Sequence, residues 1–340
     1  MTVLLEKRRL IVSPGLVPVQ QRRNDKFGHP KDVDVDLTIG LINNMPDPAL
    51  QATERQFMRL LRRAAGDIRI DFHCFSLPSV TRSQLARGRV EAQYTDIIDL
   101  DRLPIDGLIV TGAEPHATTL DGEAYWRDLT GIIDWAKDNT RSTMWSCLAA
   151  HAAVLHLDGV ERRPLDTKCS GMYDCFNVSD HWLTNGLACP VKIAHSRHNE
   201  LSARDLTASG YHLLTQSPDA GVDSFTKDFG SQFIFFQGHP EYEALSLERE
   251  YLRDISRFLN GERGVYPAMP VGYFDHETEQ RLSAFAGRAH AERRPALSGE
   301  LPERALREDI ATSTAATVMF RNWLGYLARS TQAIAPSANI

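Results

Sequence analysis

Cys147 is the residue whose type and position best fit covalent chemistry in this sequence. It follows the β-prone segment Thr143-Met-Trp145 and precedes a helical run from Leu148 to Leu157, which predicts a corner between a strand and a helix. Such a corner pushes the sulfur out of the sheet, and the amides and dipole of the following helix favour a thiolate. The alternative is a buried free cysteine that serves only as a small hydrophobe.

His239 and Glu241 supply the two further groups that a thiolate nucleophile needs. Both follow the most hydrophobic strand expected in the chain, 231–237, and they stand on either side of Pro240. A nucleophile needs a base, and the base needs an orienting acceptor, so these residues and Cys147 are predicted to form a triad. The alternative is a loop histidine beside a solvated glutamate, which an arbitrary His-Pro-Glu would more often be.

The elements around these residues predict an α/β fold with a doubly wound, mainly parallel sheet. The uncharged apolar run at 37–42 is typical of a strand buried on both faces, the segment 106–110 is predicted to be another buried strand, and helices are predicted between strands. Ligands of such sheets bind at the carboxyl ends of the strands, where Thr111-Gly-Ala-Glu and Cys147 both lie. Other expected elements are strands at 68–75, 191–197 and 211–214, helices at 53–61, 125–135, 245–259 and 315–327, and a polar segment at 277–308 that is either helical or a surface insertion.

The composition excludes several classes of function. The chain has 340 residues, 42% hydrophobic and 24% charged, as expected for a soluble globular protein. Its net charge of −6 gives no basic field for nucleic acid, and no apolar run approaches the ~20 residues of a membrane span. Five cysteines without metal-finger spacing, and no signal segment, indicate free thiols in a reducing cytoplasm. No metal site is expected, because the histidines lack helical HxxxH or HExxH spacing.

The order and spacing of the motifs resemble the homoserine O-acyltransferase family, best known as homoserine O-succinyltransferases, which has the flavodoxin-like class I glutamine amidotransferase-like fold. The amidotransferases themselves share only the triad and the fold, whereas the His-Ser-Arg and Asn-Trp-Leu segments belong to the acyltransferases. The matching segments are Ile39-Gly-Leu-Ile-Asn-Asn-Met-Pro, Thr53-Glu-Arg-Gln-Phe, Asp106-Gly-Leu-Ile-Val-Thr-Gly-Ala, Cys147-Leu-Ala-Ala-His-Ala-Ala, Lys168-Cys-Ser-Gly-Met-Tyr, His195-Ser-Arg, Gly238-His-Pro-Glu-Tyr, Glu250-Tyr-Leu-Arg-Asp and Asn322-Trp-Leu.

The resemblance implies a two-step acyl transfer with acyl-CoA as a substrate and no cofactor. Cys147 would attack the thioester of the acyl-CoA, and His239 would then take the proton from the hydroxyl of homoserine or a related hydroxy amino acid. Backbone amides at Leu148 and around Gly112 and Ala113 are the expected oxyanion donors. The resemblance also suggests a homodimer.

The family positions that bind the amino acid map to Lys168, Ser196 and Arg253. The position associated with acyl choice falls on His116, where succinyl enzymes carry glycine and many acetyl enzymes carry glutamate. A histidine leaves less room than glycine but would not repel a succinyl carboxylate. The resemblance therefore favours a succinyl donor, with acetyl as the alternative.

The sequence departs from the family pattern at three places. The lysine that usually follows Met-Pro is missing from Met45–Ala52, His151 stands where the family has glutamine, and the 277–308 segment is longer. These differences leave serine open as an acceptor. Two other classes also remain: a cysteine-dependent amidase or glutaminase of the same fold, and a non-catalytic ligand-binding relative. The missing glycines of a Gly-x-Cys-x-Gly elbow count against the amidase.

Three regions are predicted from these patterns. Residues 1–35 are expected to form an N-terminal arm, and residues 36–262 an amidotransferase-like catalytic domain. Residues 263–340 are expected to form a C-terminal extension that packs on the catalytic domain.

Overall fold

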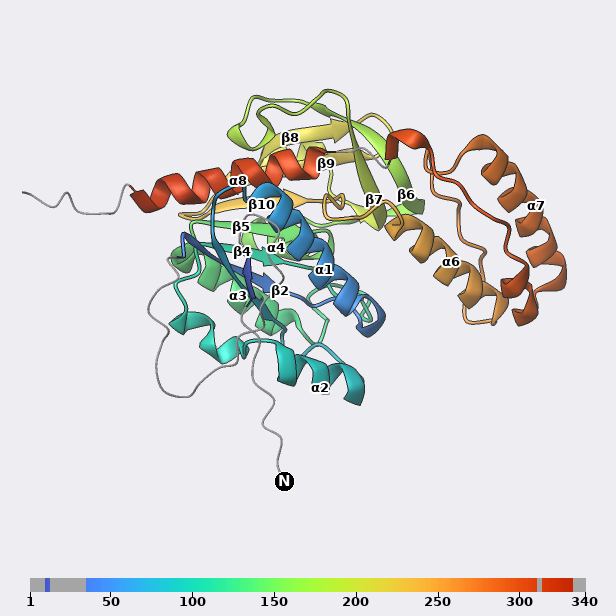
Figure 1. Ribbon diagram of the computed structural model, residues 1–340, viewed down its shortest axis with the longest axis horizontal. Helices are drawn as coiled ribbons and strands as arrows, with labels where there is room; N and C mark the ends of the chain where they lie inside the picture. The colour runs from blue at the N-terminus through green and yellow to red at the C-terminus, as the bar shows by residue number, and fades with distance from the viewer. Residues whose placement is uncertain (1–9, 13–34, 311–313, 333–340) are drawn as a thin grey trace, which may run out of the picture.

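One ten-stranded sheet organises residues 10–12, 35–310 and 314–332, the part of the chain described by the computed structural model (Figure 1). Its strand order is β1-β3-β2-β4-β5-β10-β9-β8-β6-β7. The strands are β1 (Leu10–Val12), β2 (Leu37–Ile42), β3 (Ile70–Phe75), β4 (Gly107–Val110), β5 (Ser142–Ser146), β6 (Arg163–Asn177), β7 (Val191–Glu200), β8 (His212–Ser217), β9 (Gly221–Asp228) and β10 (Gln232–Phe236). The helices are α1 (Asp47–Ala64), α2 (Gln84–Gln93), α3 (Trp126–Asn139), α4 (Leu148–Asp158), α5 (Ala203–Ala208), α6 (Ser246–Leu259), α7 (His276–Glu292) and α8 (Ala315–Gln332).

The centre of the sheet is parallel. Strands β3, β2, β4, β5 and β10 pair in this order, each parallel to its neighbour. This is the flavodoxin-like order. Its switch point lies between the first and third of these parallel strands along the chain, here β2 and β4, at their carboxyl ends. The predicted α/β doubly wound fold is confirmed. Antiparallel strands extend the sheet at both edges, with β1 beside β3 and β9, β8, β6 and β7 beyond β10.

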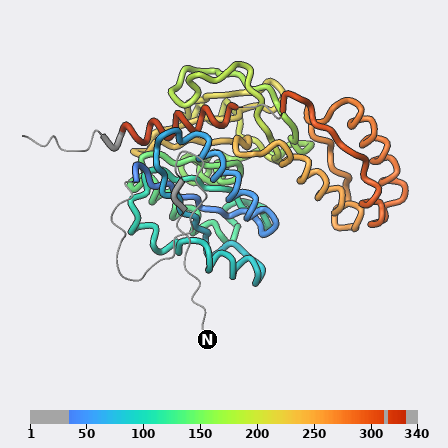
Figure 2. The backbone as a smooth tube through the Cα atoms, viewed as in Figure 1, coloured from blue at the N-terminus to red at the C-terminus, as the bar shows by residue number. Residues whose placement is uncertain are grey.

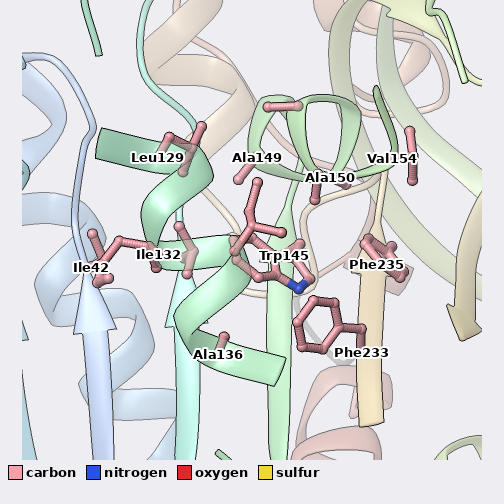
Figure 3. Close-up of a cluster of buried hydrophobic side chains, with 14 of the residues drawn as sticks. Ile42, Leu129, Ile132, Ala136, Trp145, Ala149, Ala150, Val154, Phe233 and Phe235 are labelled. Atoms are coloured by element: carbon pink, nitrogen blue, oxygen red, sulfur yellow. The ribbon is translucent and has the colours of Figure 1, made fainter. Parts of the chain in front are cut away.

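Helices cover both faces of the parallel strands. On β5, Trp145 packs under α3 and α4, whereas its neighbour Met144 packs against α1 and α8 on the opposite face. Figure 3 shows Trp145 and Phe235 on the first face, with Ala149 and Ala150 of α4 close to the strands. The alanines that follow Cys147 are buried, and their small side chains let the helix approach the sheet.

The segments after β10 form a lobe and then return to the sheet. Helices α6 and α7 share their own hydrophobic cluster beside the sheet, and the chain then comes back as α8 (Figure 2). Trp323 of α8 is buried and donates a hydrogen bond from Nε1 to Ser142 Oγ at 3.0 Å. Asn322 donates to the carbonyls of Leu183 and Asn185. We propose that the chain after residue 262 forms an extension that packs on the catalytic domain. Helix α7 packs on α6, and α8 packs on β4 and β5.

The structure differs from the sequence prediction at the start of one helix and in the N-terminal arm. The helix expected from Thr53 begins at Asp47, because Pro46 and Pro48 lie at its cap and first turn, where proline is tolerated. In the predicted arm, Leu10–Val12 forms β1, and residues 1–9 and 13–34 lie outside the described part.

Across the described residues, no helix combines the length and apolar character needed to cross a membrane.

Substituting Gly107→Ala is expected to reduce the free energy of unfolding by about 1–3 kcal/mol, the usual range for overpacking a core. A Cβ at this position of β4 would lie 2.6 Å from atoms of both Trp323 and Leu327 in α8. Urea denaturation measures the loss. Gly131→Ala in α3, where the added Cβ meets no atom within 4 Å, is the matched control and should be neutral or stabilising. Equal stability of the two variants would contradict close packing of α8 on β4.

Candidate active site at the carboxyl edge of the sheet

Cys147 occupies the predicted corner between β5 and α4. Its φ of 51° and ψ of −112° lie in a region that side chains other than glycine rarely adopt, at a cost of about 1–3 kcal/mol. Its amide donates to the carbonyl of Phe236 on β10 at 2.7 Å, and its carbonyl accepts from the amides of Ala150 and His151. These bonds hold the strained residue at the carboxyl edge of the sheet.

His239 and Glu241 project from the strand next to the cysteine. Ser146 on β5 is in register with Phe236 on β10, so the residues that follow both strands emerge side by side. His239 Nδ1 lies 2.9 Å from Glu241 Oε1, and the Cys147 side chain is close enough to His239 to raise the pKa of the imidazole. The structure therefore brings the three side chains of the predicted triad together, with the imidazole between the sulfur and the carboxylate.

The electrostatics of this group favour a charged imidazole. Burial disfavours the imidazolium, but the Glu241 carboxylate and the Cys147 thiolate outweigh burial and raise the pKa of His239 well above its ordinary value. The imidazole of His239 is therefore protonated beside Cys147. A thiolate is the nucleophilic form of cysteine, so the arrangement prepares Cys147 for attack on an acyl carbon.

The expected oxyanion donors lie next to the nucleophile. Leu148 is the first residue of α4, where backbone amides have no acceptor within the helix. Gly112 packs directly on it, since a Cβ at Gly112 would lie 2.7 Å from Leu148 Cβ and 3.2 Å from Leu148 N. Ala113 follows, half-buried, in the same loop. The two backbone segments are thus close enough to face one oxygen atom.

A second cluster of side chains adjoins the imidazole. The Tyr242 ring stacks on His239 with centroids 4.2 Å apart, and its hydroxyl donates to Glu250 of α6. Glu250 also accepts from Ser196 Oγ at 2.5 Å and lies 3.5 Å from Lys168 Nζ. Burial would raise the pKa of Glu250, but Lys168 and the two hydroxyl donors together lower it, so it is a carboxylate. Sequence reasoning missed Glu250 as a site residue, although it opens a matched motif.

Arg253 stands at the rim of this cluster. Its side chain is 46% exposed and contacts only the Asp254 carboxylate among the described residues, at 3.4 Å. Asp254 is buried and also lies 3.6 Å from Lys168 Nζ and 3.0 Å from Arg263. Lys168 and Ser196 therefore meet at one carboxylate, whereas Arg253 remains open to solvent.

His116 lies on an exposed loop that Glu123 holds in place. Glu123 is buried, and its Oε1 accepts from the amides of His116 at 2.7 Å and Ala117 at 2.8 Å. The sequence pattern gave no signal for Glu123, because its partners are backbone amides.

His151, which stands where the family has glutamine, is buried in α4 and shares one hydrogen bond with Gln237 at 3.1 Å. Burial, together with nearby Arg197 and Arg162, lowers the pKa of His151 to about 3, so it is neutral.

One group of described side chains has metal-ligand types, although no metal site was predicted. The ligand atoms of Cys175, His195 and Asp223 lie within 4.8 Å of one another, and all three residues are buried. His195 Nε2 faces Asp223 Oδ1 at 3.4 Å, and its Nδ1 accepts from Arg197 at 3.4 Å. Both ring nitrogens already face protein groups. A Cβ at Gly238 would lie 2.4 Å from Asp223 Oδ1, so this pair is packed directly behind the His239 loop.

Together the fold and this edge define an α/β enzyme with a flavodoxin-like strand order and a cysteine at its nucleophile corner. Comparison with known proteins identifies the family. The family model for homoserine O-succinyltransferase matches residues 24–334, so the chain belongs to that family. The predicted resemblance and the prediction of an acyltransferase are confirmed.

Two curated relatives are similar over almost their whole length. The homoserine O-succinyltransferase of Bradyrhizobium japonicum is 53% identical over 329 residues, which cover 96% of this chain and 99% of the relative. The homoserine O-succinyltransferase of Rhodopseudomonas palustris is 52% identical over 330 residues, with the same coverage. A glutamine amidotransferase structure from Thermotoga maritima aligns with 87% of this chain and 99% of its own at 10% identity and a TM-score of 0.45. The fold assignment rests on strand order and family rather than on that alignment.

Replacing Cys147 by alanine is expected to lower the pKa of His239, because the thiolate is one of the charges that stabilise the imidazolium. Histidine-selective NMR titration measures this change, and a His239→Asn spectrum assigns the resonance. Cys189→Ala, which removes an exposed cysteine, is the control and should leave the titration unchanged. An unaltered His239 titration in Cys147→Ala would exclude a resting thiolate–imidazolium pair.

Proposed function

We propose that this chain transfers a succinyl group from succinyl-CoA to the hydroxyl of homoserine through a thioester on Cys147. Family membership and the two relatives named above support the substrates. The observation that carries the mechanism is the hydrogen-bonded pair of His239 and Glu241 beside Cys147 at the carboxyl edge, with the raised pKa of His239. Free coenzyme A is the first product, and no cofactor takes part.

In the first step, the Cys147 thiolate attacks the thioester carbon of succinyl-CoA. The carbonyl oxygen becomes negative, and the amides of Leu148 and of Gly112 and Ala113 stabilise it by roughly a few kcal/mol each. The bond to the sulfur of coenzyme A then breaks, and the leaving thiolate takes the proton of His239. One thioester replaces another, so the step is nearly balanced in free energy. The enzyme now carries a neutral acyl cysteine and a neutral imidazole.

In the second step, the same imidazole acts as a base. Acylation removes the thiolate charge that raised the pKa of His239, while Glu241 still orients the ring through Nδ1. His239 takes the proton from the homoserine hydroxyl as that oxygen attacks the acyl carbon. The bond to Cys147 breaks, and the ester leaves. The thiolate and the imidazolium are restored together, so protons balance over the cycle.

The cluster around Glu250 is the proposed acceptor site. Lys168 and Arg253 supply positive charge for the carboxylate of the amino acid, and Ser196 supplies a hydroxyl. Glu250 supplies negative charge for its ammonium group. Tyr242 connects this cluster to the catalytic imidazole, since it stacks on His239 and donates to Glu250. The acceptor hydroxyl would then lie where His239 can reach its proton.

The finer choices remain proposals. We propose succinyl as the donor group rather than acetyl, with His116 at the position of acyl choice, and homoserine rather than serine as the acceptor. The described cysteines are all free thiols, which agrees with a reducing cytoplasm. The homodimer stays a prediction.

Incubation with succinyl-CoA is expected to add one succinyl group to Cys147, which homoserine then removes. Intact-mass spectrometry follows both changes. Acetyl-CoA and serine are tested in parallel to fix donor and acceptor, and Cys147→Ala should take up no acyl group. Glutamine should leave the protein unmodified and unhydrolysed. Acyl transfer that persists in Cys147→Ala, or glutamine hydrolysis, would contradict the proposed function.

Glu250→Gln is expected to reduce kcat/KM for homoserine about tenfold to a hundredfold, because the loss of a charged hydrogen-bond partner costs about 1.5–3 kcal/mol. The rate of Cys147 acylation should not change. The matched control is Glu248→Gln on the same helix, whose carboxylate instead accepts from Arg304 at 2.7 Å. A Glu250→Gln variant that loses acylation and acceptor turnover equally would assign Glu250 a structural role only.

A further inference from the structure

His151 is a buried polar residue beside the nucleophile that the mechanism above does not use. It lies in α4, four residues after Cys147, and its amide donates to the carbonyl of Cys147 at 3.2 Å. The residue is only 3% exposed, and its neighbours along the helix, Ala150 and Ala152, are buried as well. A polar ring in such surroundings needs a hydrogen-bond partner.

That partner is the side-chain amide of Gln237, the residue that directly follows β10. Gln237 is buried, and its Nε2 donates to the carbonyls of Val222 at 2.7 Å and Leu201 at 3.4 Å. Its Oε1 accepts from the amide of Leu201 at 2.7 Å and lies 3.1 Å from His151 Nε2. Since both amide hydrogens of Gln237 are directed at carbonyls, Oε1 is an acceptor and His151 Nε2 is the donor.

The hydrogen bond between His151 and Gln237 joins the two segments that carry the reacting side chains. One of its ends lies about one helical turn after Cys147, and the other lies two residues before His239. The backbone bond from the Cys147 amide to the Phe236 carbonyl, at 2.7 Å, joins the same two segments. The nucleophile corner and the loop of the base are thus held together by a side-chain bond as well as by a backbone bond.

The backbone strain at Cys147 explains why a second link matters. Its φ of 51° is unfavourable for a side chain, and such conformations persist only where the surrounding structure over-determines them. The pairing of β5 with β10 ends at Ser146 and Phe236, so the strand ladder stops just before the corner. The ring of His151 adds a restraint beyond that point, because it fixes the first turn of α4 to the loop of the base.

We propose that His151 is a positioning residue whose hydrogen bond to Gln237 sets the distance and orientation of Cys147 relative to His239. This inference rests on the proposed function, because the two side chains that it aligns are the nucleophile and the base of that reaction. The proton of His151 stays on Nε2 and takes no part in the acyl transfer.

The test compares His151→Leu, which removes the donor and keeps an apolar side chain, with His151→Gln, which supplies an N–H group again. In His151→Leu, Gln237 Oε1 keeps its bond to the Leu201 amide, so this buried acceptor stays paired. The single-turnover rate of Cys147 acylation at saturating succinyl-CoA should fall about threefold to tenfold, with half-saturation at an unchanged concentration. His151→Gln should recover most of the rate.

A second measurement separates positioning from a general loss of stability. Alkylation of Cys147 by iodoacetamide, followed by mass spectrometry of its peptide, gives a pH profile without any acyl donor. Because Cys147 and His239 favour each other's charged forms, a looser alignment should move the midpoint of this profile to higher pH in His151→Leu. His151→Gln should restore the midpoint. The matched control is His156→Leu on the same helix, whose ring instead pairs with Asp134 at 3.0 Å, and it should behave as the wild type in both measurements.

An unchanged acylation rate and an unchanged alkylation profile in His151→Leu would overturn the inference. A lowered unfolding temperature with a wild-type alkylation profile would overturn it too, since the bond would then serve the core alone. If His151→Leu fails to fold, His151→Met, whose flexible side chain fills irregular space, takes its place. Absence of succinylation in the wild type would instead refute the proposed function, and the alkylation profiles would still decide the role of His151.

Discussion

The interaction on which the site depends is the electrostatic attraction between Cys147 and His239, side chains that follow two adjacent parallel strands. A different neighbour favours the charged form of each side chain. The helix amides behind Cys147 favour its negative form, and Glu241 favours the positive form of the ring. Because the register of β5 and β10 sets the separation of the two groups, the sheet itself provides the alignment that the chemistry needs. The strained backbone at Cys147 is the local cost of that alignment.

A cluster of paired charges lies beside these two side chains. Glu250 and Asp254 compensate Lys168 on the side where the amino acid is proposed to bind. Next to the loop that carries His239, the His195–Asp223 pair packs against Gly238.

How far the sequence predicts this site depends on whether a residue's partner is local. Cys147, His239 and Glu241 were predictable because each directly follows an apolar strand, and adjacent parallel strands bring such positions together. Glu123 was not, because its partners are the backbone amides of a loop, which leave no pattern in the sequence. The same holds for the fold. The parallel strands have clear apolar patterns, whereas β6 and β9 mix polar and apolar residues and depend on their neighbours for pairing.

The position of α8 has a consequence for how the protein is made. This helix covers one face of β4 and β5 with Trp323 and Leu327, yet it follows all the strands of the sheet in the sequence. During synthesis the parallel strands are complete long before the ribosome releases α8, so that face of the nascent sheet stays uncovered and open to chaperones or to misassembly. Folding of the core is therefore completed only when α8 has left the exit tunnel.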